Sequence, residues 1–309
     1  MNSNNMLSEI EEIPERAKEC IEHLNQLVLP LQVPYLGMGS SYFAPLAFRY
    51  MDIPIFPALA SEYHPYLINS LNSSTAVILS QSGKSSEALW CADRFEAYTA
   101  ITNVTDSPLA VHSSCKKVVA IEAGPEHYSS SKTYINTLLT LFKGLGKNPV
   151  AAVQTIANKF NKYRDEGFAL AGQVFDRLKA GEVNGLYIIG SGPNIATALQ
   201  AALILSESVK IGFNGMAMAQ YDHGPKETAE GSILIQVLSG GPSYQRAAKL
   251  SETVQRAGAL VKVIEEKDLD EDFSILANII PFNFMACRLA ALLQAGEPFS
   301  VGSKITEVQ

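Results

Sequence analysis

Short apolar runs and longer amphipathic stretches alternate along the chain. The runs are of strand length with few polar interruptions, whereas the stretches between them repeat apolar residues every three or four positions, as helices do. Strands of this composition are buried on both faces, so the pattern predicts parallel sheets covered by helices, an α/β fold. The predicted strands are 33–36, 53–59, 75–79, 98–103, 117–123, 186–189, 232–238, 259–264 and 278–282, and the predicted helices are 7–29, 41–50, 85–98, 133–145, 148–180, 193–211, 245–258 and a last helix that reaches 293.

The same sequence pattern begins both halves of the chain. Residues 35–39 (YLGMG) and 188–192 (IIGSG) each end an apolar run with a Gly-x-Gly turn that precedes a helix. The long helix predicted over 148–180 separates the two stretches. We therefore expect two similar domains, residues 1–147 with an N-terminal helix and residues 148–309 with the linking helix, in place of one large sheet.

Composition narrows the classes of partner. The 309 residues are 47% hydrophobic and 18% charged with a formal net charge of −7, a globular composition that disfavours nucleic acid or an anionic membrane as the main partner. The polar, acidic start does not resemble a signal peptide, and the apolar run at 195–205 is too short to span a bilayer. We expect a cytoplasmic protein. The four cysteines form no metal-ligand or CxxC spacing, so we expect no metal or other cofactor, and thiols that serve as small core residues.

Two nucleotide-binding interpretations fail. The Gly-x-Gly turns lack the third glycine of a dinucleotide fingerprint, because those positions are Tyr42 and Ile195. The Gly-Lys-Ser at 83–85 imitates the end of a phosphate loop of nucleoside triphosphatases, but the first glycine of that loop would fall at Ile78, inside a strand.

Residues 80–85 (SQSGKS) still indicate a phosphate site. A buried strand ends, three hydroxyls and a glycine follow, and a helix begins. Unpaired N–H groups at a helix start suit a phosphate, and a glycine lets the backbone close around its oxygens. The alternative is that Ser82 or Ser85 only caps the helix.

Two residues of the second half are candidates for acid–base chemistry. Glu207 follows Leu199 and Leu203 at helical spacing, which predicts a carboxylate on a buried stripe with a raised pKa, useful to a general base. The alternative is a pair with Lys210 at the helix end. His223 precedes Gly-Pro, which favours a loop that presents the imidazole, although a lone loop histidine is usually only a surface residue.

These motifs, in this order, resemble the double SIS-domain (sugar isomerase) proteins. The resemblance runs from about residue 13 to the C-terminus and is greatest to the isomerase half of glucosamine-6-phosphate synthase, with related deaminases and deglycases. Its specific parts are residues 80–83 and the spacing from Glu207 to the His-Gly-Pro at 223–225. It implies two domains, each a three-layer α/β/α sandwich with a flavodoxin-like parallel sheet.

The resemblance also implies roles for individual residues. Ser80, Gln81, Ser82 and Ser85 would hold the phosphate, and Ser40, Ser41 and Ser130 would contact the sugar. Glu207 would move a proton between C1 and C2, and His223 would assist ring opening, in the site of the partner subunit if the protein is a homodimer. Lys304 would contact the open-chain carbonyl or form an imine with it.

The sequence departs from the family in ways that affect the substrate. It lacks a glutaminase half, so we do not expect a complete synthase. Lys84 stands where the family usually has an acidic residue. Asn214 and Asp222 stand where the family usually has a Glu and a Lys. The second half has 239–242 (SGGP) where the first has its phosphate loop, so we expect one phosphate site per chain. The implied function is an isomerase, deaminase or deglycase for a hexose 6-phosphate such as glucosamine 6-phosphate or fructose 6-phosphate. The alternative is a non-catalytic phosphosugar sensor.

Overall fold

The computed structural model describes residues 3–24, 26–181, 183–296, 299 and 301. They form two compact units, each built on one parallel sheet. The second-sheet unit comprises Met1–Pro14, His127–Ser131 and Ala151–Ser300, and the first-sheet unit comprises Glu15–Glu126 and Lys132–Val150, as far as these ranges are described. Two segments that the sequence analysis assigned to residues 1–147, the N-terminal residues and 127–131, therefore lie with the second sheet.

The first sheet has the strand order β2-β1-β3-β4-β5, with every pair parallel. Flavodoxin-like sheets have the same order, and the point where it reverses, between β1 and β3, is where such sheets bind ligands. The strands are β1 (Pro34–Gly37), β2 (Phe56–Leu59), β3 (Thr75–Leu79), β4 (Ala97–Thr102) and β5 (Cys115–Ala120).

Helices cover both faces of this sheet. Alternate residues of β3 point to opposite faces, and Ala76 and Ile78 pack in a buried cluster with α5 residues such as Cys91. Val77, also buried, faces the other way. On that face we place α3 and α7, whose Phe48 and Phe142 rings meet edge to face. The helical elements are α2 (Ile13–His23), α3 (Ser40–Arg49), α4 (Ala60–Glu62), the π-helical turn η1 (Tyr63–Leu67), α5 (Ser86–Ala92), α6 (Pro108–Val111) and α7 (Lys132–Gly144).

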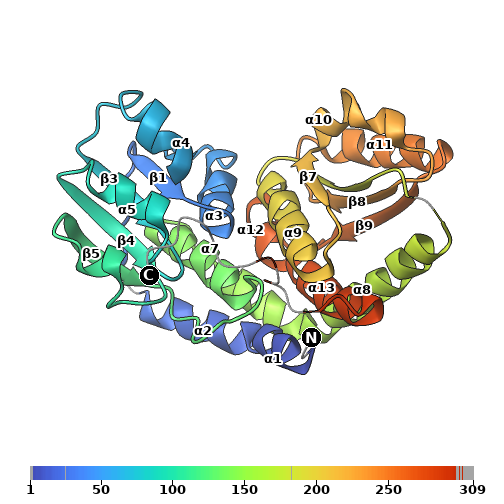
Figure 1. Cartoon of the computed structure of the whole chain (residues 1–309), viewed down its shortest axis with the longest axis horizontal. Helices are drawn as coiled ribbons and strands as arrows, with labels where there is room; N and C mark the ends of the chain where they lie inside the picture. Colours follow the sequence, from blue (N-terminus) through green and yellow to red (C-terminus); the bar gives the residue numbers. More distant parts are fainter. Residues whose placement is uncertain (1–2, 25, 182, 297–298, 300, 302–309) are drawn as a thin grey trace. The chain divides into compact units, whose positions relative to one another are not determined.

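The second sheet repeats the arrangement with four parallel strands in the order β7-β6-β8-β9. Helices α10 and α11 lie on one side of its strands, and α9, α12 and α13 lie on the other (Figure 1). Its strands are β6 (Leu186–Gly190), β7 (Asn214–Ala217), β8 (Ile233–Leu238) and β9 (Leu260–Glu265). Its helices are α1 (Ser3–Glu11), α8 (Val150–Lys179), α9 (Asn194–Val209), α10 (Met218–Asp222), the 3-10 turn η2 (Pro225–Thr228), α11 (Tyr244–Arg256), α12 (Glu271–Asn278) and α13 (Ile280–Leu293).

One predicted strand is wrong. Residues 278–282 are helical, at the junction of α12 and α13. The segment is buried throughout, and a short run that is apolar all round does not distinguish a buried strand from a buried helix. Helices α12 and α13 together run from Glu271 to Leu293, which is long and apolar enough to cross a bilayer by length and composition. However, 83% of the most apolar 18-residue stretch is buried inside the protein, as in the core helix of a soluble protein.

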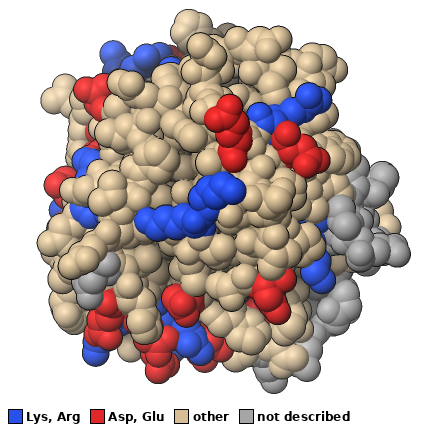
Figure 2. All heavy atoms as spheres, turned by 90° about the vertical axis from the view of Figure 1, so that its left-hand side faces the viewer, with Lys and Arg blue, Asp and Glu red and all other residues tan. Residues whose placement is uncertain are grey.

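Charged side chains are dispersed on the face shown in Figure 2. Basic and acidic groups of that face lie in small clusters, separated by larger areas without charge.

Candidate functional site

The loop after β3 carries the predicted phosphate cradle, Ser80–Ser85. Its serine hydroxyls turn toward the loop itself: Ser80 Oγ lies 3.2 Å from Ser85 Oγ and accepts a hydrogen bond from Gly83 N at 3.1 Å. Ser82 Oγ accepts one from Lys84 N at 3.3 Å. The loop is thus closed by its own hydroxyls.

Neighbouring elements fix the backbone of this loop. At the end of β4, the main-chain nitrogen of Asn103 and the Thr102 hydroxyl both donate to Gln81 O, at 3.0 and 3.2 Å. Leu109 N donates to Gly83 O at 3.0 Å. The backbone of the loop is therefore fixed by β4 and the start of α6.

Gly83 is required by the geometry. Its φ is +63°, and a Cβ built on it would lie 1.9 Å from Ser107 Oγ. No other residue fits this position without movement of Ser107.

Capping does not account for the serines. Ser85 occupies the N-cap position of α5, but its side chain makes no capping hydrogen bond. Ser80 is buried, Gln81, Ser82 and Ser85 are half-buried, and Lys84 is exposed. The loop therefore presents an amide, two hydroxyls and an ammonium group at its surface.

Ser40 and Ser41 lie at the same edge of the first sheet. They begin α3 directly after β1, and β1 pairs in parallel with β3. The close approach of strand and helix depends on Gly37, where a Cβ would lie 2.4 Å from Ser41 O. The two predicted ligand-binding loops of this unit thus follow neighbouring strands at the point where the strand order reverses.

The predicted sugar-binding Ser130 lies against the helix that carries Glu207. Gln200 Nε2 on α9 donates to Ser130 O at 3.1 Å, and Ser129 Oγ lies 3.1 Å from Ser208 Oγ. Segment 127–131 is therefore held along the helix that carries the candidate base.

Glu207 is less buried than its spacing predicted. It and Leu203 are half-buried, whereas the fully buried side of α9 is formed by residues such as Ile204 and Ser208. Leu199, Leu203 and Glu207 thus share the less buried side of α9, so the predicted buried stripe is wrong. Lys210 Nζ donates to the main-chain oxygen of Glu207 at 3.0 Å; a raised pKa of the carboxyl group stays a prediction.

His223 is exposed at the end of α10, so the expected presentation of the imidazole is confirmed. The preceding Asp222 is fixed by two cations: Lys226 Nζ and Arg246 Nη2 each donate to one carboxylate oxygen at 2.9 Å. Hydrogen bonds from these two groups lower the pKa of Asp222. These two ion pairs give the corner before Gly224 a defined geometry.

Sequence reasoning missed two residues that support Ser130. Glu9 on α1 accepts from His127 N at 2.8 Å and Tyr128 N at 3.2 Å, and Gln200 holds Ser130 as described. The signal for Gln200 was present, because it lies seven residues before Glu207 on the same side of the helix. Glu9 gave no local signal, since its partners are 118 and 119 residues away.

The remaining candidates stand apart from these groups. Lys304 lies outside the described residues. Cys20, Cys91 and Cys287 are buried, as expected of core thiols, and Cys115 is half-buried. Among the side chains that the structure describes, no group of three or more His, Cys, Asp and Glu residues could hold a metal ion.

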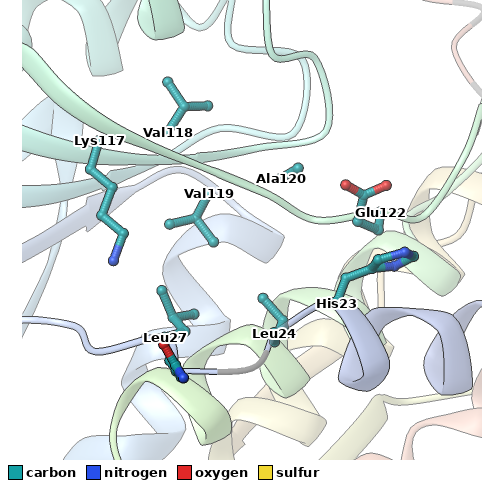
Figure 3. A pocket seen from close by; sticks show the side chains of 9 residues that line it. His23, Leu24, Leu27, Lys117, Val118, Val119, Ala120 and Glu122 are labelled. Carbon is teal, nitrogen blue, oxygen red and sulfur yellow. The ribbon is translucent and has the colours of Figure 1, made fainter.

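A cavity of about 410 Å³ lies elsewhere in the first-sheet unit, along β5 (Figure 3). It contains none of the predicted site residues. Its lining comprises His23, Leu24, Gln26, Leu27, Lys117, Val118, Val119, Ala120 and Glu122.

Comparison with known proteins supports the fold. No family model matches the chain. The chain is 25% identical over 275 residues to the isomerizing glutamine–fructose-6-phosphate aminotransferase of Methanothermobacter thermautotrophicus, an alignment that covers 83% of this chain and 46% of that protein. The chain thus spans about half the length of the curated relatives that it matches.

Two solved structures share the fold over nearly the whole chain. Glucosamine-6-phosphate deaminase from Thermotoga maritima superposes with a TM-score of 0.75 at 17% identity, covering 95% of both chains. Tagatose-6-phosphate ketose/aldose isomerase from Escherichia coli gives 0.73 at 13% identity, covering 97% of this chain and 95% of the other. At these identities the likeness establishes the fold, and the activity has to be argued from the site.

Proposed function

We propose that this protein is a phosphosugar enzyme of the aldose–ketose isomerase or aminosugar-phosphate deaminase type, with each unit an SIS domain. The observation that carries the proposal is the attachment of segment 127–131 to α9, the helix that carries Glu207. It brings a predicted sugar-binding serine and a candidate base to one helix. The printed names of the relatives, which refer to glucosamine 6-phosphate, fructose 6-phosphate and tagatose 6-phosphate, support a sugar phosphate as the substrate class.

The first-sheet unit supplies the phosphate anchor. Gln81, Ser82 and Ser85 donate to the phosphate oxygens, and Ser80 holds the loop closed and contributes its hydroxyl. Ser40 and Ser41, on the neighbouring loop, contact the sugar. An anchored phosphate contributes to catalysis because binding energy far from the reacting carbons fixes their orientation.

The second-sheet unit supplies the proton chemistry. Glu207 removes the proton from the carbon next to the carbonyl and returns it to the adjacent carbon, which interconverts aldose and ketose. His223 assists ring opening, and its exposure fits a role in the site of a partner subunit in a homodimer. Lys304 contacts the open-chain carbonyl or forms an imine that acidifies the neighbouring carbon.

Lys84 distinguishes this site from the family pattern. Its exposed ammonium group adds a cation next to the phosphate loop, which strengthens anion binding. Where the family usually has a lysine, this chain has Asp222, a negatively charged residue that is paired with Lys226 and Arg246. We infer that the substrate carries an amino or acyl substituent that differs from the one on the substrate of glucosamine-6-phosphate synthase.

The proposal is tested by incubating the purified protein with glucosamine 6-phosphate, fructose 6-phosphate and amine-conjugated fructose 6-phosphate. Formation of ammonia, free amine or an isomeric sugar phosphate supports an enzyme. Binding without any turnover supports the alternative, a phosphosugar sensor. The absence of both binding and turnover contradicts either function.

A further inference from the structure

The two edge strands of the first sheet differ in what they offer to a further strand. β2 lies at one edge and β5 at the other. Phe56 N donates to Val33 O at 3.2 Å, so the backbone of Phe56 faces β1 and the backbone of the next residue, Pro57, faces outward. A proline has no N–H group to donate there, and prolines of this kind protect an open edge. The β2 edge is therefore closed to an added strand.

The edge at β5 has no such protection. Directly after this strand, Ile121 N donates to Thr102 O on β4 at 3.0 Å, so alternate residues before it also face β4. The backbones of Val118 and Ala120 therefore face away from the sheet, and neither residue is a proline. Among the described residues, no strand pairs with β5 on this side. The β5 edge thus presents outward N–H and C=O groups, as strands that accept an added strand do.

The cavity of about 410 Å³ runs along this open edge (Figure 3). Successive side chains of a strand point to opposite faces, yet the four consecutive residues 117–120 all line the cavity. A cavity that contacts both faces of a strand lies at the edge of that strand, where the outward backbone groups are. Its lining also includes Leu24 and Leu27, which follow α2. Its volume lies in the range of about 300–1,000 Å³ that is typical of binding sites.

The side chains along the cavity have a polarity from one end to the other. Lys117 lies toward one end, and Glu122 lies beside His23 at the other (Figure 3). Lys117 Nζ donates to Val28 O at 3.3 Å, which holds the ammonium group at its end of the cavity. The side chains between the two charged ends are apolar: Leu24, Leu27 and Val119. The cavity therefore suits an extended chain with an acidic residue at the Lys117 end and apolar residues after it.

Charge argues against a second copy of this chain as the occupant. Pairing of two β5 edges would bring the exposed Lys116 and Lys117 of both copies into one sheet. Lysines on an edge strand are a device that prevents such pairing between copies. The same two lysines attract an acidic segment of a different protein.

We propose that the β5 edge is a docking site for an extended peptide segment of another protein, one with an acidic residue followed by apolar residues. The peptide adds to the first sheet as a sixth strand. Its backbone pairs with Val118 and Ala120, and its acidic side chain pairs with Lys117. The inference does not depend on the proposed function, because the cavity contains none of the residues assigned to phosphate binding or to catalysis.

The test measures binding of labelled, capped peptides to the full chain by fluorescence anisotropy. The peptides have seven residues that alternate Val and Thr, with Glu, Gln or Lys at the first or the last position. Both placements are included because an added strand runs either parallel or antiparallel to β5. In one placement the Glu peptide should bind about fivefold more tightly than the Gln peptide, and the Lys peptide should bind least.

A reversal of charge identifies Lys117 as the partner of the acidic residue. Lys117→Glu should invert the order, so that the Lys peptide binds most tightly. Lys116→Glu is the matched control, because it makes the same change in charge at the neighbouring residue, which does not line the cavity. The order of the three peptides should survive in Lys116→Glu. An order that is the same in both variants contradicts the proposal.

A backbone variant tests the added strand itself. Val118→Pro removes an outward N–H group, which an edge strand tolerates, so the protein should fold and lose peptide binding. Val118→Thr keeps the N–H group and the branched side chain and should bind like the unaltered protein. Hydrogen exchange of the unaltered protein gives the same information if the proline variant does not fold: the peptide should slow exchange at the amides of Val118 and Ala120.

Three results would overturn the proposal. One is that no peptide binds at concentrations up to about 1 mM. Another is peptide binding that persists in folded Val118→Pro or leaves the exchange of the Val118 and Ala120 amides unchanged. The third is self-association of the protein that Val118→Pro abolishes and that the peptides do not reverse, because the occupant of the edge would then be a second copy of this chain.

Discussion

The hydroxyl oxygens of Ser129 and Ser208 lie 3.1 Å apart, although 79 residues separate them along the chain. Both side chains are buried. Ser208 follows Glu207 directly, so this contact ties the serine segment at 127–131 to the part of α9 that carries the candidate base.

Loss of the Ser129–Ser208 contact should impair turnover more than phosphate binding. Ser208→Ala leaves the buried Ser129 hydroxyl without this partner, at a cost of about 1–3 kcal/mol in the free energy of unfolding. The turnover number should fall because the hydrogen bond from Gln200 to Ser130 then holds this segment on α9 without the second contact, while the dissociation constant for inorganic phosphate should stay unchanged.

The matched control for this prediction is Ser251→Ala. Ser251 is also buried in the same unit, and within the described part of the chain its hydroxyl has no hydrogen-bond partner. Equal losses of turnover in the two alanine variants would show that the Ser129–Ser208 contact has no specific role.

Gly83→Ala should abolish binding of sugar phosphates. A side chain at φ +63° costs about 1–2 kcal/mol from the backbone alone, and the methyl group would also overlap Ser107. The loop has to open, which separates its phosphate donors. Gly146→Ala is the control, since Gly146 has φ +81° but open space around its Cβ. Gly146→Ala should lose a similar amount of stability from its backbone conformation and should keep ligand binding. If Gly83→Ala also kept ligand binding, the phosphate site would have to lie elsewhere.

Glu266 should make the stability of the second-sheet unit depend on pH. Burial raises its pKa, but hydrogen bonds from Lys159, the Asp268 backbone and Tyr163 outweigh burial and lower the pKa below its ordinary 4.5. A lowered pKa in the folded state means that the ionised group stabilises the fold above about pH 4.5, and that this contribution disappears as the pH falls through the folded pKa.

Urea denaturation between pH 7 and pH 3 checks this prediction. The difference in midpoint between the unaltered protein and Glu266→Gln should be largest at neutral pH and should shrink in acid. A difference that stays constant over this pH range would show that Glu266→Gln loses stability through altered packing and not through the lost charge. Glu252→Gln, at an exposed position, should show neither effect.

The sequence predicted the parts of the fold that local patterns determine. Residues 75–79 form the predicted strand, and the predicted helix over 148–180 appears as Val150–Lys179. Helix 7–29 is instead two helices, because Pro14 has no N–H to donate to the carbonyl of Ile10 and suits the first turn of a new helix, α2. The strand predicted at 278–282 failed because burial on every side removes the periodicity that separates helix from strand.

The candidate site was predictable only where its residues are neighbours in sequence. The loop Ser80–Ser85 forms from consecutive residues, so its composition already predicted a turn between a buried strand and a helix; binding of an anion there stays a proposal. The attachment of Ser130 to α9 depends on Gln200, 70 residues away. No local pattern contains such contacts.

The most direct test of the proposed function compares Glu207→Gln with the unaltered protein on a substrate identified among the hexose 6-phosphates. A general base contributes roughly 100- to 10,000-fold to the rate, so turnover should fall by a factor in that range. The dissociation constant for the sugar phosphate should change little, because the amide has the size of the carboxyl group. Glu252→Gln should retain full turnover. A Glu207→Gln variant that binds and turns over the substrate like the unaltered protein would contradict the assignment of Glu207 as the base.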